Sequence, residues 1–172
     1  FTIYLINAST ICRDIYFRIS GQQLVNWQQA FTSRNVSVQY LNSNTGYAPN
    51  FQISGNQTML SLKFTTPSVQ PRLYLYNNNT IDTLQLHHGM DVYFGASQTQ
   101  TLKSLTGIGL CTRLIDLFST STGTQATLTD ASGTNSLNFI NFRDIRAQGG
   151  ATWEASNVTT NTNNTGWTIV PP

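Results

Sequence analysis

The stretch NQTMLSLKF at residues 56–64 recurs in altered form as NNTIDTLQL at 78–86 and, more faintly, as QTQTLKSL at 98–105. Alignment of the copies on Thr58, Thr80, Thr101 and Thr124 gives spacings of 22, 21 and 23 residues. Ser or Thr lies three positions after each aligned Thr, and Leu follows it, at 61–62, 83–84, 104–105 and 127–128. A repeat of this length predicts a solenoid, in which one unit cannot bury its apolar side alone and therefore stacks on its neighbours.

Each copy is preceded by a second segment with the composition of a strand, namely FQI, LYLY, DVYF and LIDLF. The turns between the two segments are polar or contain glycine: SGNQ, NNN, ASQ and STSTG. One unit is therefore a strand, a tight turn, a second strand and a return loop. We predict an all-β fold, a parallel β-solenoid or β-helix with rungs of about 22 residues. An antiparallel β-sandwich also has short strands at regular spacing and stays the alternative.

Stacking of the rungs predicts two inward columns of apolar side chains. One column contains Met59, Ile81 and Leu102, and the other contains Leu62, Leu84 and Leu105. The two columns are three positions apart along each strand, whereas residues two apart share a face of a straight strand. We therefore expect a corner or a bulge between them. Thr, Ser and Asn are expected to form ladders that face outward or line the turns.

Helical patterns are nearly absent, while β-branched and aromatic residues alternate with polar ones along the chain. The segment 23–31 is the one candidate for a short helical turn, because Leu24, Trp27 and Phe31 would share a face. The clearest strands are expected at 2–7, 14–19, 36–41, 73–76, 91–94, 113–118 and 137–142.

The first 45 residues fit the repeat poorly. We expect residues 1–45 to form an N-terminal cap or a small β unit, and residues 46–172 to form the solenoid with its own C-terminal cap. The start at Phe1 indicates a chain that is already processed or cut from a longer polypeptide. Cys12 and Cys111 would be several rungs apart, at about 4.8 Å each. We expect no disulfide between them unless the N-terminal segment folds back.

The composition excludes some classes of function. Charged residues make up 9% of the 172 residues, against roughly 25% in an average protein, so solubility rests on neutral polar side chains. The net charge of +2 includes no run of Lys or Arg. A nucleic-acid surface needs a basic stripe, so we expect no nucleic-acid partner. No apolar run approaches the roughly 20 residues of a membrane helix, so we expect no membrane insertion.

Candidate chemistry is sparse. Asp82 and Asp91, with His87 and His88 between them, form the one local grouping that could serve as a site, but its spacing matches no metal motif. Residues 87–89 coincide with an expected return loop and are interpreted as a turn. We therefore predict no catalytic, metal or cofactor site, no cofactor, and a protein that is not an enzyme. The seven carboxylates are Asp14, Asp82, Asp91, Asp116, Asp130, Asp144 and Glu154.

Words in the last third of the chain resemble a known type of segment. In order they are Gly109–Cys111, Ser119–Thr120, Gly123–Leu128, Ser132–Thr134, Asp144–Trp153 and Asn163–Ile169. Over about residues 100–170 this order is similar to repeat or β-helix-type segments of large secreted surface proteins of the Bacteroidota. Those proteins are adhesin-like and often substrates of type IX secretion, and similar segments occur in phage-encoded proteins. The resemblance implies a secreted, cell-surface location.

Within these words, Gly149 and Gly150 are expected to allow positive φ where the chain leaves a strand. Trp153 and Trp167 are expected to plug the end of the stack, and residues 163–166 to form a turn. Arg143 and Arg146 flank Asp144 and are interpreted as surface charges. The resemblance also implies O-glycosylation at Asp82-Thr83-Leu84. N-glycosylation sequons begin at Asn7, Asn35, Asn56, Asn78, Asn157 and Asn163.

The function predicted from these observations is a non-enzymatic extracellular module, structural or adhesive, within a larger surface assembly. Its Thr-, Asn- and Tyr-rich face would contact carbohydrate or a neighbouring protein, so the expected partners are other protein subunits and glycans. The first alternative is a phage virion fibre or decoration protein, which would form a defined oligomer or filament. The second is a polysaccharide-degrading β-helix enzyme, for which Asp82 or Asp91 would be essential.

Overall fold

The computed structural model describes residues 12–19, 24–27, 32–40, 50–65 and 70–171, and no helix occurs in these ranges. Alternating apolar and polar residues form the strands, with the apolar ones buried. The strands are β1 (Cys12–Ile19), β2 (Leu24–Trp27), β3 (Thr32–Tyr40), β4 (Asn50–Ile53), β5 (Thr58–Thr65), β6 (Arg72–Leu75), β7 (Asn79–His87), β8 (Asp91–Phe94), β9 (Thr99–Ile108), β10 (Ile115–Ser119), β11 (Ala126–Thr129), β12 (Thr134–Arg143), β13 (Ile145–Gln148), β14 (Thr152–Thr162) and β15 (Thr168–Val170).

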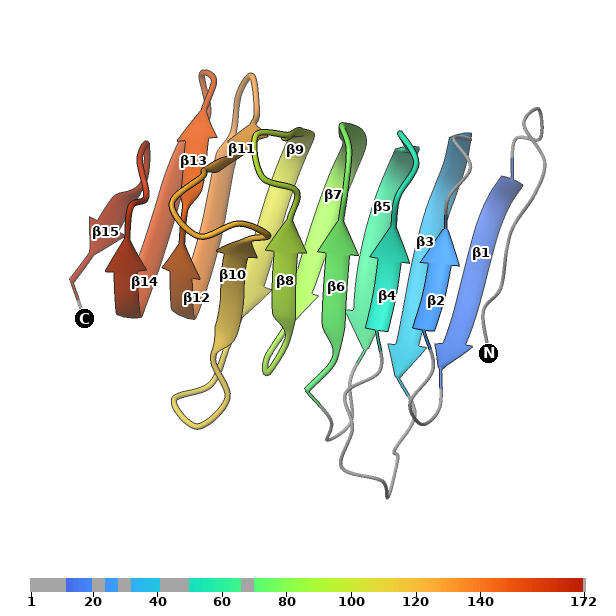
Figure 1. Cartoon of the computed structure of the whole chain (residues 1–172), viewed down its shortest axis with the longest axis horizontal. Coiled ribbons are helices and arrows are strands. Elements are labelled where there is room, and N and C mark those ends of the chain that lie inside the picture. Colours follow the sequence, from blue (N-terminus) through green and yellow to red (C-terminus); the bar gives the residue numbers. More distant parts are fainter. Residues whose placement is uncertain (1–11, 20–23, 28–31, 41–49, 66–69, 172) are drawn as a thin grey trace.

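The strands stack as a parallel β-solenoid of about six turns with a spacing near 22 residues. Every pair of strands in the described ranges is parallel, which rules out the antiparallel sandwich. Figure 1 shows the rungs side by side along the long axis, with β1 and β15 at opposite ends. The predicted fold class is therefore confirmed.

Three ladders of strands run along the solenoid, and we name them faces A, B and C. Face A contains β2, β4, β6, β8, β10 and the second part of β12. Face B contains the first parts of β3, β5, β7 and β9, followed by β11 and β13. Face C contains the second parts of the same long strands, followed by the first parts of β12 and β14.

Both predicted inward columns are confirmed. Met59 pairs with Ile81 and Ile81 with Leu102, while Leu62, Leu84 and Leu105 stack in the same order. All six side chains are buried. The ladder skips Leu60, Asp82 and Lys103, and these positions mark the corner between faces B and C. The expected corner between the columns is thus present, because alternation restarts there with its phase changed.

The fourth copy of the repeat was aligned wrongly on Thr124. Thr129, not Thr124, pairs with Thr101, and Leu128 pairs with Gln100 rather than with Leu105. The turn from face A to face B spans residues 95–98 in the preceding rung but residues 120–125 in this one, and Thr124 lies inside it. The longer turn shifts the register of everything that follows it.

The predicted helical turn at 23–31 is also wrong where the structure describes it. Leu24–Trp27 is strand β2, with Val25 and Trp27 buried and Leu24 exposed, which is the period of two of a strand. The expected strands at 14–19, 36–41, 73–76, 91–94, 113–118 and 137–142 correspond to β1, β3, β6, β8, β10 and β12. The strand expected at 2–7 and the boundary expected near residue 45 lie outside the described residues.

The last rungs close the apolar interior with two indole rings. Trp153 is buried, and its ring centroid lies 5.3 Å from that of Trp167, which in turn lies 5.3 Å from the ring of Phe142. Gly149 has a φ of +99°, as expected for the exit from β13. Cys111 is an exposed free thiol in the loop after β9. No helix in the described ranges has the length and apolar character needed to cross a membrane.

Candidate functional site

The structure does not bring the two predicted carboxylates together as a site. Asp82 lies at the corner between faces B and C, where its carboxylate accepts a hydrogen bond from Lys103 Nζ at 2.7 Å. Asp91 begins β8 on face A and accepts from Gln70 Nε2 at 2.6 Å and from Arg72 Nε at 3.4 Å. Each carboxylate thus has a separate partner on a separate surface.

The turn predicted at 87–89 is confirmed. His87 ends β7, and His88 and Gly89 form the turn, with Gly89 at a φ of +72° and its N–H donating to the carbonyl of Leu114. Burial lowers the pKa of His88, and the positive charges of His87 and Arg113 lower it further. Among the described residues, no group of three or more His, Cys, Asp or Glu side chains is arranged to hold a metal ion.

Face A instead places Asp91 beside Asp116, which occupies the matching position in the next rung. Burial raises the pKa of Asp116, a hydrogen bond from Asn141 lowers it, and the neighbouring charge of Asp91 raises it again, with a net increase. Asp91 in contrast is paired with Arg72. Two adjacent carboxylates in different electrostatic surroundings are a feature of acid–base chemistry, although ion-pair networks produce it too.

A stack of aromatic rings runs beside these carboxylates on face A. Tyr74 and Tyr93 are stacked with centroids 4.7 Å apart and ring planes at 10°, and Phe118 follows at 5.8 Å. Tyr76 stacks on the other side of Tyr74, and the guanidinium of Arg143 covers the ring of Phe118 at 5.0 Å. The ring faces are therefore occupied by one another, and the stack offers a ligand mainly its ring edges and phenolic oxygens.

Face B carries two outward columns of short polar side chains, which we call the Thr/Asn columns. The first contains Thr32, Thr58, Thr80, Thr101 and Thr129 in consecutive rungs and then reaches Gln148. The second contains Asn56, Asn78, Thr99, Thr127, Arg146 and Thr165. In the second column, Asn78 N donates to Asn56 Oδ1 and Thr99 N to Asn78 Oδ1, so the amides also join the rungs.

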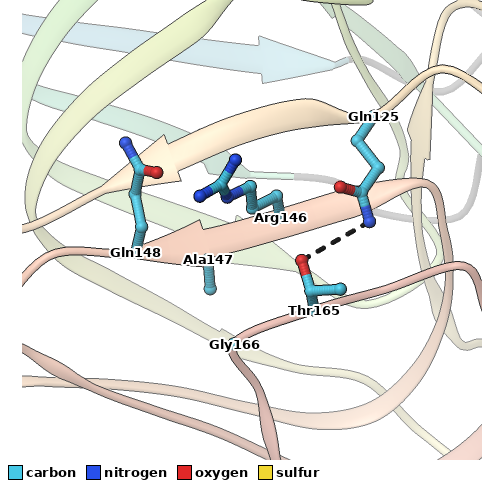
Figure 2. A pocket seen from close by; sticks show the side chains of 6 residues that line it. All are labelled: Gln125, Arg146, Ala147, Gln148, Thr165 and Gly166. Atoms are coloured by element: carbon cyan, nitrogen blue, oxygen red, sulfur yellow. Dashed lines mark hydrogen bonds between the residues drawn. The ribbon is translucent and has the colours of Figure 1, made fainter.

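The Thr/Asn columns lead into a shallow hollow of about 430 Å³ near the C-terminal end. Its lining residues come from β13, from the turn before β11 and from the segment after β14: Gln125, Arg146, Ala147, Gln148, Thr165 and Gly166. Figure 2 shows the Arg146 side chain between the amides of Gln125 and Gln148. Gln125 Nε2 donates to the carbonyl of Asn163 at 2.7 Å and to Thr165 Oγ1 at 3.4 Å.

A second hollow, of about 380 Å³, is largely apolar and lies at the end of the stack. Cys111, Phe139, Val158, Ile169 and Val170 are among its lining residues. Ile169 and Val170 belong to β15, whose three residues are all exposed. This end of the solenoid therefore presents apolar side chains on a strand that pairs with β14.

Sequence reasoning missed Asp116 and the polar hollow because both depend on neighbours in adjacent rungs. One available signal was the recurrence of an acid two positions before an aromatic residue, in Asp91-Val92-Tyr93 and Asp116-Leu117-Phe118. Arg146 gave no such signal, since the misaligned fourth copy concealed its place in the Thr/Asn columns. As predicted, Arg146 is an exposed charge, whereas Arg143 is half-buried, pairs with Asp144 and covers Phe118.

Comparison with known proteins finds no matching family model, no similar curated protein and no similar solved structure.

Proposed function

We propose that the protein is a non-enzymatic extracellular module, structural or adhesive, that presents its Thr/Asn columns to carbohydrate or to a neighbouring protein. The observation that supports this most is the continuity of the columns across consecutive rungs. A parallel ladder fixes the spacing of the hydroxyls and amides, so little side-chain freedom is lost when a ligand is bound. Many weak contacts of this kind suit a repetitive ligand such as a polysaccharide.

Glycan binding tests this proposal through the threonine hydroxyls. Thr58→Val, Thr80→Val and Thr101→Val together remove three hydroxyls from the first column while keeping β-branched, strand-forming side chains. A glycan-array screen should identify bound glycans for the unmodified chain, and the triple variant should bind them at least about tenfold more weakly, a loss of roughly 1.4 kcal/mol.

The matched control removes three exposed threonine hydroxyls away from the Thr/Asn columns, with Thr106→Val, Thr159→Val and Thr162→Val. This variant should bind as the unmodified chain does. Equal losses for both triple variants would contradict a role for the columns. Size-exclusion chromatography with light scattering on the same sample gives the oligomeric state. A stable oligomer or filament without glycan binding would support the fibre or decoration protein of a virion, for which the exposed apolar end of β15 is the supporting observation.

Asp91 and Asp116 favour a second candidate, a polysaccharide-degrading enzyme. In glycoside hydrolysis one carboxyl group stays protonated to donate a proton while the other is ionised. The raised pKa of Asp116 and the Arg72 partner of Asp91 support those two roles. Release of reducing ends from polysaccharides, lost by a factor of about 100 or more in Asp116→Asn, would establish it. Asp82→Asn serves as the control because Asp82 lies at the corner between faces B and C.

A further inference from the structure

The hollow of Figure 2 holds a cation that no acid of the described residues neutralises. Arg146 is exposed and forms no salt bridge within the described ranges. The nearest acid in sequence, Asp144, is engaged by Arg143 Nε at 3.2 Å, by Gly123 N at 3.0 Å and by the amide of Asn163. The guanidinium therefore retains its hydrogen-bonding capacity for a ligand.

The surroundings of Arg146 are rigid. β13 is held by β11 on one side and by the bridge to Thr165 on the other. The chain passes so close at Gly166 that an added Cβ would lie 1.9 Å from the carbonyl oxygen of Ala147. Gln125 is anchored by its two hydrogen bonds to the 163–165 segment. A ligand would thus meet a preformed surface rather than a mobile loop.

The chemistry of the hollow fits a carboxylate that is accompanied by hydroxyls. A guanidinium presents a planar fork of donors that matches the two oxygens of a carboxylate. The Gln148 amide offers a donor and an acceptor, and Gln125, whose Nε2 is occupied, offers its Oε1 as an acceptor for a hydroxyl. A uronic acid residue carries both kinds of group on one ring.

We propose that this hollow binds the carboxylate of a uronic acid residue in an acidic polysaccharide. The proposal rests on the carbohydrate-binding function proposed above and names its ligand class. Arg146 continues the column of Thr127 and Thr99, and Gln148 continues that of Thr129 and Thr101. Sugar units that follow the bound uronate along the solenoid axis would therefore meet the hydroxyls of the Thr/Asn columns.

Alginate, a polymer of uronic acids, is the probe, and alginate esterified with propylene glycol is its counterpart without free carboxylates. Binding of each polymer to the full chain is measured by affinity electrophoresis and isothermal titration calorimetry at low and high salt. Two variants lose one positive charge each: Arg146→Gln in the hollow and Lys63→Gln at an exposed position of β5. Both substitutions are at exposed side chains, and thermal unfolding confirms that each variant is folded.

We expect Arg146→Gln to weaken alginate binding at least about tenfold and Lys63→Gln to change it less than about twofold. The esterified polymer should bind at least about tenfold more weakly than alginate, and salt should reduce the difference. Equal losses for the two variants would show diffuse charge attraction and overturn the site, as would equal binding of the two polymers.

The same experiment separates this inference from the proposed function. Binding of neutral glycans to the unmodified chain, with no binding of alginate, overturns the uronate site while the adhesive function stands. Failure to bind any glycan on the array removes the carbohydrate arm of the proposed function and the uronate site with it.

Discussion

Asp144 joins three parts of the last rungs through one carboxylate. It is buried, it adopts a φ of +59°, and it accepts hydrogen bonds from Gly123 N and the Asn163 amide while pairing with Arg143. Burial alone would raise its pKa, but these hydrogen bonds and the Arg143 charge outweigh burial and hold the pKa below its ordinary value of 3.8. Asp144 thus fixes the long turn 120–125 that shifts the register.

Asp144→Asn should lower the free energy of unfolding at neutral pH by about 2 kcal/mol, because charge-assisted hydrogen bonds are lost while Asn still tolerates positive φ. The folded pKa lies below the unfolded one, so the stabilisation by the carboxylate is complete above the unfolded pKa and disappears as pH falls through the folded pKa. Urea unfolding should therefore show a constant difference from about pH 5 to 8 that shrinks below about pH 4.

Asp82→Asn is the control for Asp144→Asn, since the exposed pair with Lys103 should contribute less than about 1 kcal/mol. A difference between Asp144→Asn and the unmodified chain that stays the same down to pH 2 would show that the charge of Asp144 does not stabilise the fold.

Gly133 and Gly149 have nearly the same φ, +98° and +99°, but different surroundings. A Cβ at Gly133 meets nothing within 4 Å, whereas a Cβ at Gly149 would lie 1.9 Å from the carbonyl oxygen of Asp130. Gly133→Ala should therefore cost about 1–2 kcal/mol, the penalty of a left-handed backbone. Gly149→Ala should cost at least about 2 kcal/mol more, because backbone must move. Equal urea midpoints for the two variants would contradict the close approach of the chain at Gly149.

At the scale of the strand, the corner of β5 and β7 separates two kinds of leucine. Leu84 lies in an inward column between Leu62 and Leu105 and is fully buried, whereas Leu60 lies at the corner and is 46% exposed. Leu84→Ala should lower the free energy of unfolding by about 2–5 kcal/mol, since it leaves a cavity. Leu60→Ala should cost less than about 1 kcal/mol. Urea unfolding compares them, and similar losses would place the corner elsewhere.

The strands that obey the repeat could be predicted from the sequence. Thr58, Thr80 and Thr101 mark equivalent positions because their turns have similar lengths, and the apolar positions after them are spaced evenly. Thr124 failed because a longer turn precedes β11, and the Thr pattern alone cannot distinguish a residue in a turn from one in a strand. Trp27 failed because Leu24, Trp27 and Phe31 fit a helix, whereas the burial of Val25 and Trp27 follows a strand.

At the scale of the whole molecule, each surface site joins residues from different rungs. Asp91 meets Asp116 across 25 positions, and Arg146 meets Gln125 and Thr165 across 21 and 19 positions, so an error in register removes the site from view. The aromatic stack from Tyr74 to Arg143 arises in the same way. The sequence could therefore predict the architecture of the solenoid but not the groups that it gathers on its surface.

The stacked arrangement also predicts how stability varies along the molecule. In a solenoid each rung contacts its neighbours alone, so local opening is easiest at an end and hardest between paired rungs. β7 is paired on both sides, with β5 and β9, whereas β15 pairs with β14 through three positions and has all its residues exposed. Amide hydrogen exchange measured by mass spectrometry should be at least about a hundredfold slower in β7 than in β15, a difference of roughly 2.7 kcal/mol in opening free energy. Protection of β15 equal to that of β7 in the isolated chain would mean that the exposed apolar end is covered, as in an assembly that buries it. Repeating the exchange at low and high protein concentration separates these cases, because protection by assembly increases with concentration while protection within one chain does not.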